Sequence, residues 1–175
     1  MRDSLRQAVG VVLAIVLTTY GRPSLVPLVA GGLLVIDGVL IRLWASGHIR
    51  KNLKLATGGP YRWVRHPLYV GNLLLSLGFC IASGRWWAWP VMGLFWLIFY
   101  PNAIGEEDRK LERLFGDDWR RWRERTPALV PRLSPTCPAS TGWKLSRSLR
   151  LNGEPAIAAV LLVCLALLYR RLLSG

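Results

Sequence analysis

Five apolar segments place the strongest constraint on how this chain can fold. They cover residues 5–20, 25–44, 67–83, 86–104 and 155–173. In a bilayer a run of about 20 apolar residues satisfies its own backbone hydrogen bonds as a helix, and the third and fourth segments are near the lower limit for a span. Turn signals at 21–24 and 84–85 predict antiparallel hairpins. The sequence therefore predicts an all-α polytopic membrane protein with about five transmembrane helices.

Composition agrees with this fold class. The chain is 52% hydrophobic yet carries a net charge of +13, and it contains nine Trp, a residue that gathers where bilayer meets water. The cations fall between the apolar segments, so we expect no nucleic-acid partner. Its 175 residues predict one domain, residues 1–175. The three Cys at 80, 137 and 164 have no metal-ligand spacing, so neither a metal site nor a disulfide is predicted.

The basic residues also predict an orientation. If the five segments alternate across the membrane, all but four of the 23 Lys and Arg lie on one side, and cytoplasmic loops carry such an excess. We therefore expect an inner (plasma) membrane protein of bacterial type. Its N-terminus and its polar regions 45–66 and 105–153 would face the cytoplasm. The four exceptions are Arg22, Arg85, Arg170 and Arg171.

The first polar region contains a dense polar and aromatic cluster at a helix entrance. Pro67 suits the first turn of a helix, and the backbone amides of Leu68 and Tyr69 would then point out of its end. With Arg65 and His66 beside them, these amides favour an anion such as a carboxylate or a phosphate. The alternative is a pair of cations that anchors the chain at the bilayer boundary.

The second polar region begins with an acidic run, Glu106, Glu107 and Asp108. We expect it to open an amphipathic helix over residues 106–125, after a break near Pro101 or Gly105, with its apolar side on the membrane surface. In the alternative interpretation the acids only cap that helix. Residues 126–140 hold four Pro and should be irregular. The apolar side would consist of Leu111, Leu114, Phe115, Trp119 and Trp122.

Both polar regions are predicted on one membrane face, where they would form a receptor for a zwitterion. A free amino-acid group fits this receptor, with its carboxylate at the Arg–His side and its ammonium at the Glu side. The rings of Tyr61, Trp63 and Tyr69 are suited to stack on an adenine or to face a cation.

Two motifs in this order resemble those of a known family. Residues 57–71 read TGGPYRWVRHPLYVG, which is similar to the SGPYxxxRHPxYxG signature of the integral membrane methyltransferases. Residues 106–119 read EEDRKLERLFGDDW and resemble that family's EExxLxxxFGxxY block; RTPALVP at 125–131 is also similar. The family comprises isoprenylcysteine carboxyl methyltransferases and phospholipid N-methyltransferases. The resemblance covers about residues 43–131 and leaves the segment 155–173 without a matched motif.

The resemblance implies S-adenosylmethionine as cofactor and direct displacement at its sulfonium methyl. The acceptor would be a small lipophilic substrate, isoprenoid or phospholipid-like, entering from the bilayer among membrane lipids. Glu107 would receive the cofactor ammonium, with Glu106 or Asp108 as the alternative. A proton from an amine acceptor would pass to Glu106 or Glu107. The implied cofactor contacts are Tyr61, His66, Pro67, Leu68, Tyr69, Gly71, Glu107 and Lys51; the implied catalytic residues are Glu106, Glu107, Asn102 and Arg65.

Two residues complicate the choice of substrate. The prenylcysteine enzymes carry an Arg about a turn before the Glu block, where this chain offers Asn102 instead. Asp37 lies midway along an apolar segment, where an acid is costly; we expect a partner such as Arg42 or another helix, or else a role toward an amine head group.

Two other functions stay open at this level. One is a membrane sterol-type reductase with a nicotinamide cofactor, and the other is a non-enzymatic scaffold or transporter.

Overall fold

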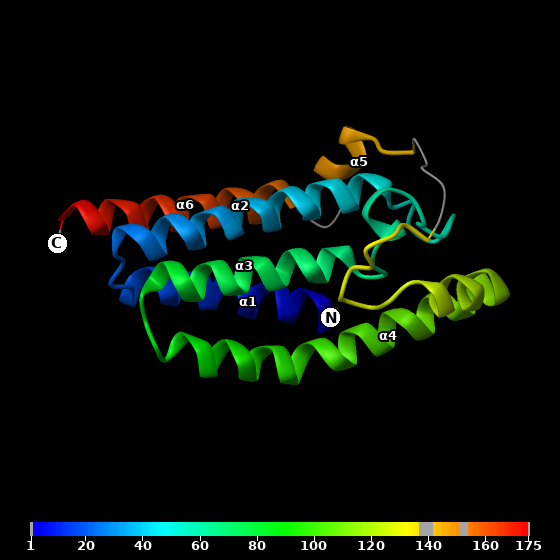
Figure 1. Cartoon of the computed structure of the whole chain (residues 1–175), viewed down its shortest axis with the longest axis horizontal. Helices are drawn as coiled ribbons and strands as arrows, with labels where there is room; N and C mark the ends of the chain where they lie inside the picture. The colour runs from blue at the N-terminus through cyan, green and yellow to red at the C-terminus, as the bar shows by residue number, and fades with distance from the viewer. Residues whose placement is uncertain (1, 137–141, 151–153, 175) are drawn as a thin grey trace. The chain divides into compact units, whose positions relative to one another are not determined.

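The computed structural model describes residues 2–136, 142–150 and 154–174 (Figure 1). The elements assigned within these ranges are helices, with no strand among them. The predicted all-α class is therefore confirmed for the described residues; Cys137 lies outside them. The α-helices are α1 (Arg2–Tyr20), α2 (Leu25–His48), α3 (Pro67–Ser83), α4 (Ala88–Arg125), α5 (Leu145–Arg150) and α6 (Glu154–Ser174), and the 3-10 helix η1 spans Gly59–Arg62.

Most helix boundaries follow the local turn chemistry. Helix α1 ends before Gly21, and α3 begins at Pro67 as its missing N–H and fixed φ favour. Helix α3 ends before Gly84, which has a φ of 62°, a left-handed conformation that Gly adopts without a Cβ penalty. Helix α2 continues to His48, four residues beyond the apolar segment, and the short helix α5 was not predicted.

Helix α4 differs from the prediction. No break occurs near Pro101 or Gly105: the apolar segment and the acidic run belong to one helix, Ala88–Arg125. The interruption lies instead at Gly116, whose φ of 49° and ψ of −123° are outside the helical region. Only Gly adopts such angles at low cost, so the chain kinks there. The acidic residues 106–108 therefore lie within a helix rather than at a helix start.

The packing of the chain divides it into two compact units. The first unit contains residues 1–39, 73–101 and 155–175. Within it α2 approaches α3 at Gly31 and Gly78, and it approaches α6 where Gly32 faces Leu165. Helix α1 approaches α4, where Arg6 lies 5.5 Å over the ring of Tyr100. Small residues let helix backbones come close together, as at helix interfaces in membranes.

The second unit contains residues 40–72 and 102–154 and has its own apolar core. Ala45, Tyr61, Trp119 and Trp122 form that core, and Leu111 and Phe115 pack against it. The apolar side of the α4 segment 106–125 is thus largely buried within this unit, with Leu114 exposed. Trp119 and Trp122 are buried and Leu111 and Phe115 half-buried against this core, and the placement of the helix on the membrane surface stays a prediction.

Membrane-spanning capacity is clearest for two helices. Helices α2 and α6 are long and apolar enough to cross a membrane. Residues 4–20 of α1 and the whole of α3 are also apolar, but each is shorter than 18 residues. A count of five spans stays a prediction.

The contact between Gly31 and Gly78 gives a test of the first unit. A Cβ at Gly78 would lie 2.6 Å from the Gly31 carbonyl oxygen and 2.8 Å from Val35 Cγ2. Backbone atoms cannot rotate away, so Gly78→Ala should destabilise the protein by about 1–3 kcal/mol, as overpacking does. Gly93→Ala is the matched control, because no atom lies within 4 Å of its Cβ position. It should gain up to about 1 kcal/mol from helix propensity. Thermal unfolding in detergent measures both, and equal melting temperatures would contradict the close contact.

Candidate functional site

Asp108 joins the two predicted halves of the site. One carboxylate oxygen accepts a hydrogen bond from Arg65 Nη1 at 2.8 Å, and the other lies 3.0 Å from His66 Nε2. Arg65 and His66 precede α3, whereas Asp108 lies on α4, so the contact joins segments more than 40 residues apart. The side chains are 11%, 2% and 13% exposed, which makes this a largely buried charge cluster.

The cluster shifts the protonation of its members. Burial alone would lower the pKa of His66, but hydrogen bonds and charges of Asp108 and Glu107 outweigh it, so this pKa lies above its usual value. Burial would likewise raise the pKa of Asp108, yet His66 and Arg65 hold it below its usual value. The site therefore favours an imidazolium beside carboxylates.

Glu107 occupies a different position from Asp108. Its Oε2 lies 3.6 Å from His66 Nδ1, and its side chain is 42% exposed. Successive helical residues point about 100° apart, which places Asp108 inward and Glu107 toward open space. Of the three carboxylates that the acidic run left open, Asp108 holds the cations and Glu107 is the exposed one beside His66, while the residue that receives a ligand stays a prediction.

Aromatic side chains lie next to these charges. The ring of Tyr69 stacks on His66, with centroids 5.4 Å apart and planes at 17°. Tyr61 is buried; its burial raises the pKa of its hydroxyl well above the usual value, and the charges of Glu107 and Glu154 raise it further. Tyr61 therefore stays a neutral hydroxyl within the field of the acidic side of the site. Pro67 is buried as well, and Leu68 packs against the core of the second unit.

The predicted anion site at the start of α3 needs a correction. The Tyr69 amide donates to the His66 carbonyl at 2.9 Å, so it is already used within the first turn. The amides of Arg65 and His66 donate to the carbonyls of Pro127 and Ala128 at 2.8 and 3.1 Å. The 126–136 loop thus covers this helix entrance, and of the two amides predicted to bind an anion, that of Tyr69 is already used.

The other predicted site residues lie outside the contacts described above, and for these residues the structure gives position and burial. Lys51 is exposed in the turn after α2. Asn102 is exposed on α4, one turn before the half-buried Glu106, so both occupy the same side of that helix. Gly71 is buried on α3. Their roles stay predictions.

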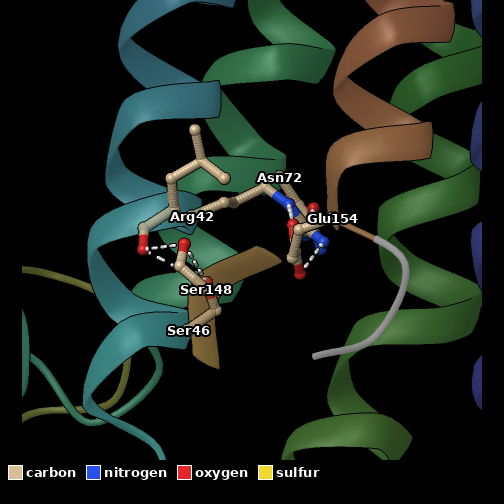
Figure 2. Close-up of polar contacts among 6 residues, drawn as sticks. Arg42, Ser46, Asn72, Ser148 and Glu154 are labelled. Atoms are coloured by element: carbon tan, nitrogen blue, oxygen red, sulfur yellow. Dashed lines mark hydrogen bonds and ion pairs between the residues drawn. The ribbon is translucent and has the colours of Figure 1, made fainter. Parts of the chain in front are cut away.

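A second buried charge cluster escaped the sequence analysis. Figure 2 shows Arg42 of α2 in a two-pronged contact with Glu154, the first residue of α6, at 2.9 Å (Nε) and 2.7 Å (Nη2). The same guanidinium donates to the side-chain oxygen of Asn72. The partner of Arg42 is thus Glu154 rather than the predicted Asp37, whose side chain is exposed. The only sequence signal was an acid at the start of an apolar segment.

This cluster has a hydroxyl pair beside it. Ser148 of α5 donates to the Leu43 carbonyl at 2.6 Å and lies 3.1 Å from Ser46 Oγ (Figure 2). Both serines are fully buried. Helix α5 and the start of α6 are therefore fixed to the end of α2 by polar contacts.

Comparison with known proteins identifies the family. The described chain is helical, and its buried charge cluster brings residues of both motifs together. A family model described as phospholipid methyltransferase matches residues 26–118, just over half of the chain, and the chain belongs to this family. No solved structure gives a significant match.

Several curated proteins resemble the chain over part of its length. The cobalt-zinc-cadmium resistance protein CzcN of Cupriavidus metallidurans is 43% identical over 95 residues, which cover 53% of this chain and 44% of that protein. The protein-S-isoprenylcysteine O-methyltransferase of Schizosaccharomyces pombe is 32% identical over 46% of this chain and 34% of its own length. Methanethiol S-methyltransferase 1 of Bradyrhizobium diazoefficiens is 37% identical, covering 41% and 24%. The chain matches about half or less of the length of these relatives.

The charge cluster predicts a characteristic pH dependence of stability. A raised His66 pKa contributes stability that is complete below about pH 6.5 and is lost as pH rises through the folded-state value. A lowered Asp108 pKa contributes stability above about pH 4 that is lost as pH falls through its folded-state value. Asp108→Asn should therefore lower the free energy of unfolding most between about pH 4 and 6.5. The expected loss is roughly 3 kcal/mol, as for a broken buried pair.

Unfolding in detergent across this pH range measures the effect. Asp117→Asn is the control, since Asp117 lies on the same helix with a side chain 80% exposed. It should change stability little at any pH. A cost of Asp108→Asn that does not vary with pH would contradict the charged state of the cluster.

Proposed function

We propose that this protein transfers a methyl group from S-adenosylmethionine to a lipophilic acceptor at a membrane face. The observation that carries the proposal is the assembly of Arg65, His66, Glu107 and Asp108 into one cluster, because these residues come from both matched motifs and lie within the family-matched segment. The names of two relatives add support, since both describe methyltransferases.

The residues present fit the amino-acid part of this cofactor. Glu107 offers a half-exposed carboxylate for an ammonium group. Both ring nitrogens of His66 already face carboxylates, Asp108 at 3.0 Å and Glu107 at 3.6 Å, so a cofactor carboxylate would take over the longer contact, that with Glu107, while the cofactor ammonium pairs with Glu107. When bound, the cofactor supplies an electrophilic methyl group on a sulfonium.

The protein's own residues then bind and orient. Asp108 holds His66 and Arg65 in place, and the Tyr69 ring stacks on the imidazole and limits its rotation. Fixed geometry of this kind would lower the barrier of a displacement, because the bound groups would lose less orientational freedom on reaction. Tyr61 and Pro67 are both buried, so the residues next to His66 on this side are closed to water.

The acceptor end of the site is proposed to lie along α4 at Asn102 and Glu106. An acceptor that is already an anion needs no base, whereas an amine must lose a proton, which Glu106 would take. An isoprenoid or phospholipid-like substrate would enter sideways from the bilayer, with α2 and α6 as the clearest spans. The same proposal places the site on the cytoplasmic face, where the basic loops lie under the positive-inside rule.

Calorimetric titration of S-adenosylhomocysteine into the full chain in detergent tests the proposal. Wild type should bind, and Glu107→Gln should bind about ten- to a hundredfold more weakly, since a charge-assisted hydrogen bond contributes about 1.5–3 kcal/mol. His66→Gln should weaken binding in the same way. Asp118→Asn is the control, because its carboxylate lies on the same helix and is 76% exposed in a surface pair; its affinity should equal that of wild type.

Two results would overturn the proposal. Absence of binding by folded wild type rules out this cofactor, and a parallel titration with a reduced nicotinamide dinucleotide would then test the reductase alternative. Wild-type affinity in Glu107→Gln would place the cofactor elsewhere in the chain.

A further inference from the structure

A basic cavity includes Arg65, the partner of Asp108, among its lining residues. Its volume is about 670 Å³, in the range of small-molecule sites. Glu112 and Glu124 are its acidic residues, so arginines outnumber acids among the charged groups. All of the lining residues belong to the second unit. The arginines are Arg65, Arg120, Arg123, Arg125 and Arg132.

One of these arginines has an unused donor. Arg65 Nε is buried and has no hydrogen-bond acceptor among the described residues. Such a donor costs about 1–3 kcal/mol when left unsatisfied. That atom is closed to solvent, so the cavity attracts an anion through its surrounding guanidinium groups rather than through Nε itself.

The charge of the cavity argues against the proposed cofactor as its ligand. S-adenosylmethionine carries a sulfonium and an ammonium against one carboxylate, so its net charge is positive. The cavity is lined mainly by cations, and like charges repel. The basic cavity and the cluster of His66 and Glu107 therefore select different ligands.

Exposed apolar side chains beside the cavity indicate where the anion comes from. Arg132 lies in the 126–136 loop between Val130, which is 77% exposed, and Leu133, which is 99% exposed. A phospholipid has two parts, acyl chains and a head group. The exposed aliphatic pair matches the acyl chains, and the neighbouring arginines match an anionic head group. Neither a free phosphate nor a soluble anion accounts for the aliphatic pair.

We propose that this cavity binds the head group of an anionic phospholipid from the surrounding bilayer, with Val130 and Leu133 inserted among the acyl chains. Clusters of Lys and Arg next to apolar helices bind anionic lipid through about 1 kcal/mol per cation. Because most of the apolar side of residues 106–125 packs internally, this contact gives the loop and the end of α4 a separate attachment to the membrane. The proposal does not depend on methyl transfer.

The loop that carries the aliphatic pair is fixed to the motif segment by backbone hydrogen bonds. The Arg132 amide donates to the Trp63 carbonyl at 3.1 Å, and the Thr136 amide donates to the Arg62 carbonyl at 2.8 Å. The Arg65 and His66 amides donate back to the same loop. A lipid held there would thus stabilise the backbone that positions His66.

Native mass spectrometry of the full chain, released from neutral detergent with dihexanoyl-phosphatidylglycerol and dihexanoyl-phosphatidylcholine, tests the site. Wild type should retain the anionic lipid in preference to the zwitterionic one. Arg123→Gln with Arg132→Gln should weaken the anionic lipid about thirtyfold, the effect of about two cations. Arg113→Gln with Arg121→Gln removes the same charge from exposed positions on α4 outside the cavity and should keep the preference.

Further variants separate a lost site from a misfolded one. Arg123 lies 5.0 Å over the Trp119 ring and Arg132 donates to the Arg125 carbonyl, so Arg123→Lys with Arg132→Lys keeps the charge while changing these contacts. The Lys pair should keep most of the preference for the anionic lipid. Loss of that preference would show that the packing of the two arginines, rather than their charge, determines lipid binding. Equal retention of both lipids by wild type, or an unchanged preference in the Gln pair, would overturn the proposal. Displacement of the lipid by equal concentrations of inorganic phosphate would identify a free-phosphate site instead.

Discussion

The carboxylate of Asp108 is the interaction on which the candidate site depends. It accepts hydrogen bonds from Arg65 and His66, which lie 43 and 42 residues before it in the sequence. The contact thereby joins the segment before α3 to α4. Charges with so little exposure stay ionised only while each keeps its partner. The position of Glu107 beside His66 and the stack of Tyr69 on the imidazole both follow from that arrangement.

The 126–136 loop completes the same arrangement through the backbone. Because its carbonyls accept the amides of Arg65 and His66, the residues before α3 are held on both sides, by α4 through side chains and by the loop through main chain. This explains why an irregular, Pro-rich segment belongs to the second unit. The carbonyls of Pro127 and Ala128 accept the two amides, and the amides of Arg132 and Thr136 donate back to the carbonyls of Trp63 and Arg62, so the loop and the motif segment satisfy each other's backbone groups.

Local signals were sufficient for most helix boundaries and insufficient for α4. Pro67 and Gly84 act through their own backbone angles, so their effects can be read from sequence. Pro101 also disfavours a helix, yet α4 continues through it without a break in its helical angles. The actual kink at Gly116 depends on a tertiary requirement: Trp119 and Trp122 after it must reach the core that Phe115 and Leu111 before it also contact.

The site shows the same division between local and tertiary information. The sequence identified both polar segments, since each concentrates unusual residues, but the different roles of Glu107 and Asp108 depend on the helical phase relative to His66. It gave no way to pair Arg42 with Glu154, which lie 112 residues apart. Each residue alone is typical of a membrane boundary, and only the fold brings them into a buried pair.

That pair makes the family-matched segment depend on residues beyond it. The match ends at residue 118, whereas Glu154 supplies the counter-charge for a guanidinium inside the match. Removing one partner of a buried pair leaves an uncompensated charge, while replacing both with apolar residues is often neutral. Burial is the main cause of the raised pKa of Tyr61; beside it, the charge of Glu154 raises this pKa and that of Arg42 lowers it. Both members of the pair, one of them outside the family-matched segment, therefore act on the electrostatics at Tyr61.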